Sequence, residues 1–336
     1  MKISLANQSF QTKWNKFVFN QPQSFFYHDF RWQKIAKQLG FKPQYFIARE
    51  KGKLTGLLPL FIKKGLLGGT RLVSLPFGEA GPLGETKIQR QLIDEALTSA
   101  KRLNANLEII SPQKIAHLPK GLVQRSEYSY YILETDLSYQ KIFEKSFHKK
   151  TRNMIRKADK AGIRATSGSI NDLGEFYDLY LKTMRKLGAL PFPYDVFIKT
   201  WDSFSKETKL LRAVFKRETI GFLWIFEWNK AVWIWANATE EKYLPLGVNY
   251  ALYSEAVKLA CKDKQIEQVN FGGSEPDSSQ EFFKLRWGAG EKPVFMISNH
   301  SSGNQKEGLQ KRLAPIIKNM PIFLVRIMGK LAYKIY

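Results

Sequence analysis

A repeated segment limits what this chain can fold into more than any other feature of its sequence. Residues 211–223 align with residues 46–58 without a gap. The two copies share an alanine and a glycine at matching positions: Ala48 with Ala213, and Gly56 with Gly221. Each copy has two apolar runs around a short polar turn, which is typical of a β-hairpin. Because the elements after each copy also correspond in kind, the repeat predicts a duplicated α/β module.

The second copy shows its order of elements most clearly. Residues 220–228 and 231–238 are rich in β-branched and aromatic residues and flank an Asn-Lys turn. A helical pattern over residues 249–262 follows, and then an apolar strand at residues 266–271. The loop before the helix leads into a helix N-terminus, whose backbone N–H groups lack intrahelical partners. The loop is therefore either an anion site or an ordinary loop capped by Asn249.

Length and charge set the class of protein. The chain has 336 residues, of which 44% are hydrophobic and 14% aromatic, enough for two folded domains with their own cores. Its 53 basic and 30 acidic residues give a net charge of +23. Such an excess indicates a polyanionic partner, which RNA, anionic lipid and a phosphate-rich donor would each satisfy.

We expect four parts along the chain. Residues 1–140 form the first module, residues 141–164 a basic connecting helix, residues 165–300 the second module, and residues 301–336 a linker and a tail. The predicted fold class is α/β, with a central mixed sheet flanked by helices in each module.

The connecting helix is the most basic run. It holds nine Lys or Arg against two acidic residues, a net of +7. Its cations fall mostly on one helical face, and we take three of them as candidate phosphate or polyanion ligands: Lys149, Arg152 and Arg156. A solvated charged face is the alternative.

The tail mixes cations with apolar residues. Residues 306–336 carry seven Lys or Arg against Glu307 alone, a net of +6. The cations interrupt the apolar runs too often for a membrane span, but the mixture suits helices lying on an anionic membrane surface. A helical pair docked on the protein's own body is the alternative.

One motif carries the chemistry. The strand at residues 266–271 runs into Phe271-Gly-Gly-Ser-Glu-Pro-Asp, and a short helix with Phe-Lys and Trp-Gly follows. The glycines permit a sharp turn, and Asp277 or Ser278 can cap the helix. Ser274, Asp277 and Lys284 should then lie near the carboxyl end of a strand, where open α/β sheets commonly bind ligands. A tight turn with a surface lysine is the alternative.

This motif resembles the final-domain signature of FemAB-like transferases of the GNAT superfamily, and residues 147–158 extend the likeness. The whole chain from about Ser24 is similar to FemAB-like proteins associated with exosortase and exopolysaccharide systems. The resemblance implies transfer of an acyl or aminoacyl group to an amine of a peptidoglycan or polysaccharide precursor of the cell envelope. No cofactor is bound; the donor co-substrate is acyl-CoA, an acyl carrier protein or aminoacyl-tRNA. A typical acetyl-CoA loop is richer in glycine than this one, which argues mildly against CoA.

The resemblance also assigns roles. Lys284 matches the lysine of the family's Phe-Lys pattern and is expected to stabilise an oxyanion or a phosphate with a permanent charge. Asp277 is a candidate base or a loop cap, and Glu227 and Glu281 are further candidate bases that the sequence does not rank. Six residues are candidate donor contacts: Trp235, Asn237, Gly247, Val248, Asn249 and Ser274.

Other chemistries find no support in the sequence. The four histidines are scattered without metal-ligand spacing, and phosphate-loop, nucleophile-elbow and dinucleotide motifs are missing. The single cysteine, Cys261, lies in an apolar helical pattern and is expected to be a structural thiol. The N-terminus lacks a signal-peptide core, so we expect a cytoplasmic protein, peripheral at the inner membrane face. A nucleic-acid-binding protein and a peripheral membrane scaffold, both without catalysis, are the rival functions.

Overall fold

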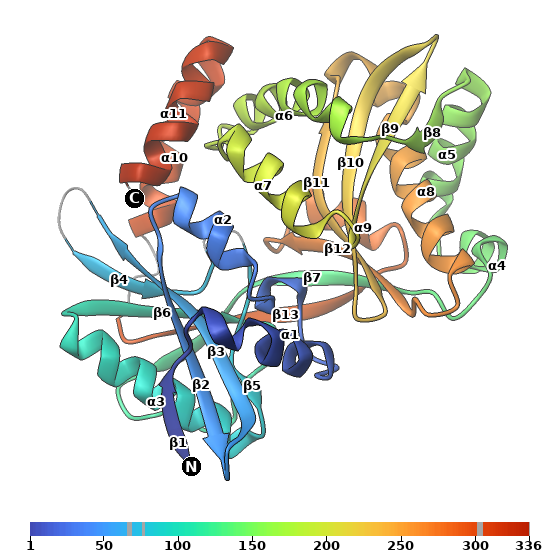
Figure 1. Cartoon of the computed structure of the whole chain (residues 1–336). Helices are drawn as coiled ribbons and strands as arrows, with labels where there is room; N and C mark the ends of the chain where they lie inside the picture. The colour runs from blue at the N-terminus through green and yellow to red at the C-terminus, as the bar shows by residue number, and fades with distance from the viewer. Residues whose placement is uncertain (66–68, 76–77, 301–304, 336) are drawn as a thin grey trace. The chain divides into compact units, whose positions relative to one another are not determined.

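The computed structural model describes residues 1–65, 69–75, 78–300 and 305–335 (Figure 1). The chain divides into two compact units, each built from separate stretches. Unit 1 comprises residues 1–128, 293–306 and 330–336, and unit 2 comprises residues 129–292 and 307–329. Among the described residues, no helix is long and apolar enough to cross a membrane.

Unit 1 is a mixed sheet with helices packed on it. Its strands lie in the order β1 (Lys2–Leu5), β2 (Lys42–Glu50), β3 (Lys53–Lys64), β4 (Thr70–Val73), β6 (Ala105–Ser111) and β13 (Gly290–Ser298), and β5 (Leu83–Gly84) pairs with β3. Its helices are α1 (Gln11–Phe19), α2 (Trp32–Gln38) and α3 (Thr86–Arg102). The parallel strands β4 and β6 are joined by α3, whose Leu92 and Ala96 are buried.

Unit 2 contains a further set of parallel and antiparallel strands. Its strands lie in the order β7 (Val123–Glu134, which begins in unit 1), β12 (Gln268–Ser274), β11 (Ala231–Thr239), β10 (Glu218–Trp228), β9 (Thr208–Phe215) and β8 (Arg164–Ser167). Its helices include α4 (Tyr139–Lys145), α5 (Lys149–Ala161), α6 (Leu173–Leu187), α7 (Tyr194–Phe204), α8 (Val248–Lys262) and α9 (Ser279–Leu285).

Alternating residues of β10 show how the unit 2 sheet is covered. Leu223 and Ile225 pack in a core cluster with residues of α5 and α8. The intervening Trp224 packs instead against Phe176 of α6 and Phe197 of α7, at centroid distances of 5.5 and 5.9 Å. Because successive side chains of a strand point to opposite faces, α5 and α8 cover one face and α6 and α7 the other (Figure 1).

The duplicated hairpin is confirmed. Ala48 pairs with Gly56 between β2 and β3, and Ala213 pairs with Gly221 between β9 and β10. A Cβ at Gly56 would stand 2.4 Å from Ile88 of α3, and a Cβ at Gly221 would stand 2.5 Å from Thr239 of β11 and 3.2 Å from Val248 of α8. In both copies the glycine therefore gives room to the helix that follows the hairpin.

The predicted domain boundaries differ from the compact units. The expected basic connecting helix is two helices, α4 and α5, and both pack within unit 2. Ile142, Ile155 and Ala158 join the unit 2 core, because the basic residues occupy the other faces of these helices. The second predicted module was expected to include all of β13. This strand pairs with β6, and its residues from Pro293 onward belong to unit 1.

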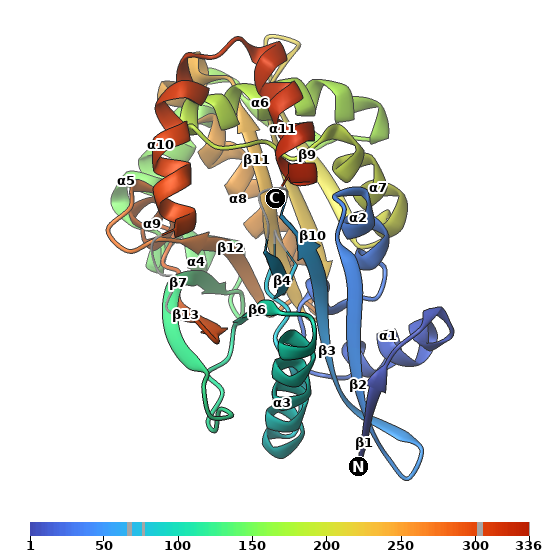
Figure 2. The same ribbon diagram turned by 90° about the vertical axis from the view of Figure 1, so that its left-hand side faces the viewer.

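The tail forms two helices, α10 (Gln305–Asn319) and α11 (Ile322–Ile335) (Figure 2). Within unit 2 it docks on the end of α6 and the loop that follows: a Cβ at Gly188 would meet Ala314 at 2.7 Å. A Cβ at Gly329 of α11 would stand 2.6 Å from the Pro191 carbonyl oxygen. Arg326 donates to Asp178 at 2.7 Å. These contacts agree with the alternative interpretation of the tail, a pair of helices docked on the protein's own body. Residues 301–304 of the predicted linker lie outside the described residues.

Candidate active site

The site is built around the place where two parallel strands of unit 2 stop pairing. β11 and β12 pair only from Ala231 to Trp233, opposite Gln268 to Asn270. The register of β11 against β10 then slips by one residue at Trp235, which is a β-bulge. Beyond this point the ladder between β11 and β12 ends, and β12 continues through the two glycines of the motif to Ser274.

Lys284 is directed from α9 to this end of β12. Its Nζ donates to the carbonyl oxygens of Gly272 and Gly273, at 2.9 and 2.6 Å, and lies 5.6 Å from the centroid of the Tyr131 ring. Gly272 has a φ of 79°. A Cβ at Gly272 would lie 3.5 Å from the Ile234 carbonyl oxygen of β11 and 3.9 Å from the lysine nitrogen. The lysine therefore sits beside the two strands where they part.

Burial decides the charge of Lys284. Its residue surface is only 6% exposed, and this desolvation lowers the pKa of its amine to about 7. The expectation of a permanent charge is therefore wrong, because both protonation states are populated near neutral pH. A neutral amine that donates to two carbonyls keeps its lone pair for accepting a proton. A protonated amine has a third N–H for an oxyanion.

The loop between β12 and α9 is held by Glu281 and Ser278. Tyr131 Oη donates to Glu281 Oε1 at 2.6 Å, and the Asp277 amide donates to Glu281 Oε2 at 2.5 Å. Burial, and then the Glu281 carboxylate, raise the pKa of Tyr131 above its usual range. Ser278 Oγ accepts from the Glu281 amide at 3.1 Å, so Ser278 is the helix cap. Both oxygens of Glu281 therefore accept hydrogen bonds that hold the loop, and its role as a base stays a prediction.

Asp277 does not have one of its two predicted roles, that of capping the loop and α9. It has a left-handed φ of 58° and is exposed, and the described residues make no hydrogen bond to its carboxylate. It is not the cap of α9. Of the two predicted roles, only that of a general base is left as a prediction for Asp277. The other candidate base, Glu227, forms an ion pair with Lys209 on the neighbouring strand β9.

Two buried polar atoms of β12 have no hydrogen-bond partner among the described residues. They are Ser274 Oγ and Asn270 Nδ2, on residues that are 5% and 0% exposed. Buried polar atoms are nearly always paired in folded proteins, so both are candidates for contact with a ligand or water. Asn270 was not among the residues predicted from the sequence; an asparagine between the apolar Val269 and Phe271 of a strand is the signal that could have found it.

The predicted anion loop leads into α8. Gly247 has a φ of 88°, and a Cβ on it would meet the Met154 carbonyl oxygen of α5 at 2.7 Å. Val248 is fully buried in the core, so its side chain packs there, and its backbone is the part that can face a donor. Asn249 Oδ1 is buried and makes no hydrogen bond within the described part of the chain. The first turn of α8 thus lies directly against α5.

The basic residues of α5 are partly fixed in place. Arg152 donates to the carbonyl oxygens of Phe147 and Glu144, at 2.5 and 3.1 Å, and so caps the end of α4. The guanidinium carbon of Arg156 lies 5.3 Å from the centroid of the Phe143 ring. Lys149 begins the helix and is exposed. Both arginines are therefore directed towards α4 and the residues that follow it.

The two predicted donor contacts on β11 have structural partners. Trp235 packs against Trp224 and Phe197, at centroid distances of 5.1 and 5.5 Å, in the aromatic layer under α6 and α7. Asn237 Nδ2 donates to the Phe222 carbonyl oxygen at 3.0 Å. Their contact with a donor stays a prediction.

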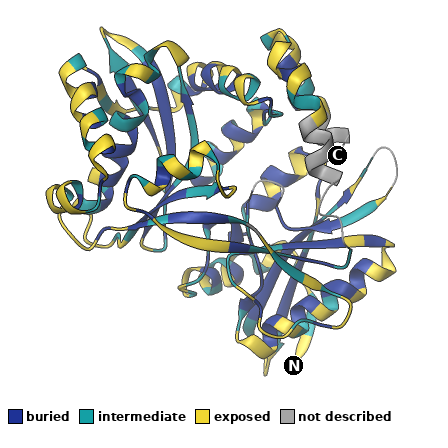
Figure 3. Cartoon of the chain, turned by 180° about the vertical axis from the view of Figure 1, so that it is seen from behind, coloured by how far each residue is buried: buried dark blue, intermediate teal, exposed yellow. Residues whose placement is uncertain are grey.

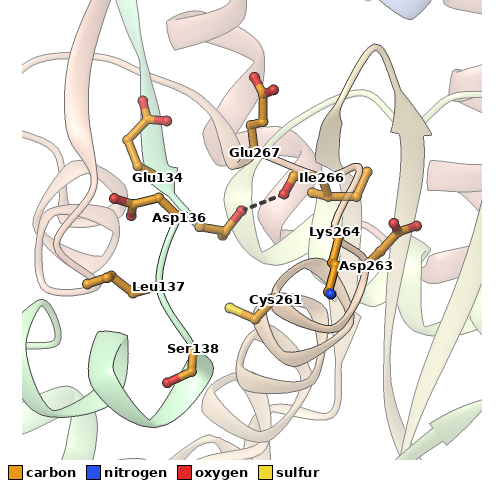
Figure 4. Close-up of a pocket in the computed structure, with 10 residues that line it drawn as sticks. Glu134, Asp136, Leu137, Ser138, Cys261, Asp263, Lys264, Ile266 and Glu267 are labelled. Atoms are coloured by element: carbon orange, nitrogen blue, oxygen red, sulfur yellow. Dashed lines mark hydrogen bonds between the residues drawn. The ribbon is translucent and has the colours of Figure 1, made fainter.

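A cavity of about 530 Å³ lies at the other end of β12 (Figure 4). Its walls run from Glu134 to Ser138 on one side and from Cys261 to Glu267 on the other, and Thr135 Oγ1 donates to the Ile266 carbonyl oxygen at 3.3 Å. Four of its lining residues are acidic, which disfavours an anionic donor, and none of the predicted site residues lines it. Burial raises the pKa of the Cys261 thiol, as expected for a structural cysteine. No group of three or more metal-ligating side chains occurs in the part of the chain that the structure describes.

The region that carries the candidate site matches a known protein family. The family model described as an acetyltransferase (GNAT) domain matches residues 145–284, which include α5, α8 and Lys284. No curated protein matches the sequence.

Three solved structures share the fold. FemX has a TM-score of 0.68 at 13% identity, over 94% of this chain and 100% of that chain. L-PGS from Bacillus licheniformis has a TM-score of 0.57 at 13% identity, over 96% and 97%. A tandem GNAT protein from the clavulanic acid biosynthesis pathway has a TM-score of 0.53 at 11% identity, over 90% and 100%. At these identities the likeness shows the fold, and it confirms the predicted architecture of two GNAT-like modules.

Proposed function

We propose that the chain is a FemAB-like acyltransferase of the GNAT superfamily that transfers an acyl or aminoacyl group to an amine of a cell-envelope precursor. The proposal rests on the GNAT match over residues 145–284 and on the position of Lys284. The envelope acceptor is suggested by two proteins with the same fold, FemX and the C-terminal domain of a putative lysylphosphatidylglycerol synthetase from Agrobacterium fabrum.

The single observation that carries the mechanism is a buried lysine with a pKa of about 7 beside the end of β12. The acceptor nitrogen attacks the carbonyl carbon of the donor, and the carbonyl π electrons move to the oxygen. Neutral Lys284 takes a proton from the nitrogen, and the ammonium formed returns a proton to the leaving sulfur or oxygen when the tetrahedral intermediate collapses. A general acid–base whose pKa is near the operating pH serves both steps.

The donor is anchored by its phosphates at the first turn of α8, near Gly247 and Asn249. GNAT domains use acyl-CoA as co-substrate, and the short loop of this chain binds such a donor through backbone N–H groups. Helix α5 lies against the same turn through the Met154 carbonyl oxygen and Ala158, and its basic residues are on its other faces. A larger donor, such as an acyl carrier protein or an aminoacyl-tRNA, would also contact Lys149, Arg152 and Arg156. Acyl-CoA can bind without contacting these three residues.

Thermal unfolding with a panel of donors tests this assignment. A specific ligand stabilises the folded state by mass action. Stabilisation by acyl-CoA would identify a CoA-dependent enzyme, and preference for charged over uncharged tRNA would identify an aminoacyl transferase. An equal response to every polyanion, lost at high salt, would contradict the proposal and favour a nucleic-acid-binding protein without catalysis.

The role of Lys284 is tested with the cognate donor. Lys284→Met is expected to lower kcat roughly a hundredfold or more, as the loss of a general acid–base does. Lys292→Met, which removes an exposed lysine of β13, is the matched control. Unchanged turnover in the folded Lys284→Met protein would rule out the mechanism and leave a scaffold role open.

A further inference from the structure

Helix α11 has two faces with different surroundings. Val325 is 1% exposed and Gly329 contacts Pro191, so the face that carries them is docked on the body. Phe323 and Ile327 are 62% and 46% exposed. At about 100° per residue, Phe323 and Ile327 lie opposite the docked face. Docking therefore leaves large apolar side chains facing outward.

The outward stripe continues along the helix. Leu324 and Leu331 are also exposed and fall within the same third of the helix circumference as Phe323 and Ile327. On the preceding helix, Ile316 is 55% exposed while the next residue, Ile317, is buried. Figure 3 shows exposed and buried segments alternating along the described part of this tail. We call Phe323, Leu324, Ile327 and Leu331 the outward face.

The charged side chains of α11 itself are all basic. Residues 322–335 contain no acidic residue. Arg326 and Lys330 are four residues apart and border the outward face on one side. Arg326 is held there by Asp178 at 2.7 Å and by the Tyr177 ring, whose centroid is 5.4 Å from the guanidinium carbon. These contacts fix the orientation of the helix, whose apolar stripe is bordered by the ion-paired Arg326 and the exposed Lys330.

We propose that the outward face of α11 binds the surface of an anionic lipid bilayer. Large apolar side chains beside cations on one helix suit insertion at the level of the headgroups, where the apolar groups leave water and the cations meet lipid phosphates. Because the opposite face of α11 stays docked, the whole protein is held at the membrane without a spanning segment. The proposal does not depend on acyl transfer, and its tests need no turnover.

Vesicle sedimentation tests the proposal. The purified protein is expected to sediment with phosphatidylcholine vesicles that contain about one third phosphatidylglycerol, much less with phosphatidylcholine alone, and less at high salt. The double variant Phe323→Gln/Ile327→Gln should lower the partition coefficient roughly tenfold or more. Its control is Leu5→Gln/Phe19→Gln, which removes two comparably exposed apolar residues of unit 1 and should bind as the wild type does.

A second variant separates charge from apolar contact. Lys318→Gln/Lys330→Gln should weaken binding to anionic vesicles and leave thermal unfolding unchanged, because both lysines are exposed. Equal sedimentation of the wild type and the Phe323→Gln/Ile327→Gln protein would overturn the proposal. Sedimentation velocity without lipid gives the other contrary result: a wild-type dimer that the same variant converts to a monomer would assign the outward face to a second copy of the chain.

Discussion

Replacing Lys284 by methionine should change how stability depends on pH. The pKa of a lysine is 10.5 in the unfolded chain and is lowered to about 7 for folded Lys284. Between these values the unfolded state binds more protons than the folded state, so the free energy of unfolding rises with pH. The destabilisation is fully present below about pH 7 and is gone above about pH 10.5. Its full size is on the order of 5 kcal/mol, at 1.36 kcal/mol per unit of pKa.

Over a range of two pH units the change in the free energy of unfolding is smaller than this full value. From pH 7 to pH 9 the two pKa values give wild-type unit 2 about 2 kcal/mol of extra stability from this one group. Lys284→Met should lose that rise and remain stable at pH 7, although the carbonyls of Gly272 and Gly273 lose their donor. The loss of those two hydrogen bonds is the same at both pH values, so the difference between the two pH values isolates the charge.

Guanidinium unfolding at pH 7 and pH 9 measures this difference for the wild type, Lys284→Met and the exposed-lysine control Lys292→Met. The control should rise with pH as the wild type does. A ¹⁵N NMR titration of lysine amines should show one resonance, absent from Lys284→Met, that titrates near pH 7. A rise of equal size in all three proteins would refute the argument that burial lowers the pKa of Lys284.

Three further predictions concern single side chains. Gly272→Ala should cost about 1–2 kcal/mol of unfolding free energy, because alanine must adopt a φ of 79° there, and should lower kcat by shifting the Gly272 carbonyl that accepts from Lys284; a circular-dichroism melt and a rate measurement test both. Ser274→Ala should leave the melting temperature unchanged or higher, since the buried hydroxyl has no partner among the described residues, and should weaken donor binding in calorimetry. Gly56→Ala and Gly221→Ala should each destabilise by about 1–3 kcal/mol in denaturant unfolding, because each Cβ would stand within 2.5 Å of a side chain; a neutral result at both glycines would contradict the packing argument.

Local sequence patterns predicted the architecture well. The hairpins, the strand-loop-helix-strand unit and the motif before α9 each depend on turn residues and apolar periodicity within short stretches. The pairing of Ala48 with Gly56 and of Ala213 with Gly221 follows from the same repeat that suggested two modules. The boundaries of the compact units did not follow, because β13 pairs with β6 across most of the chain, and no local pattern encodes such a partner.

The charge state of Lys284 shows why site chemistry is harder to predict than fold. Its sequence neighbours in α9 include the half-exposed Phe282, and a helix pattern alone would place a lysine in solvent. What buries it is β12, where the carbonyls of Gly272 and Gly273 accept hydrogen bonds from the amine, and Tyr131 of β7 beside it. The same packing that removes water from the amine therefore supplies its hydrogen-bond acceptors and lowers its pKa. A pattern of residues along one chain segment can name this lysine as a candidate, but its proton affinity is a property of three elements brought together by the fold.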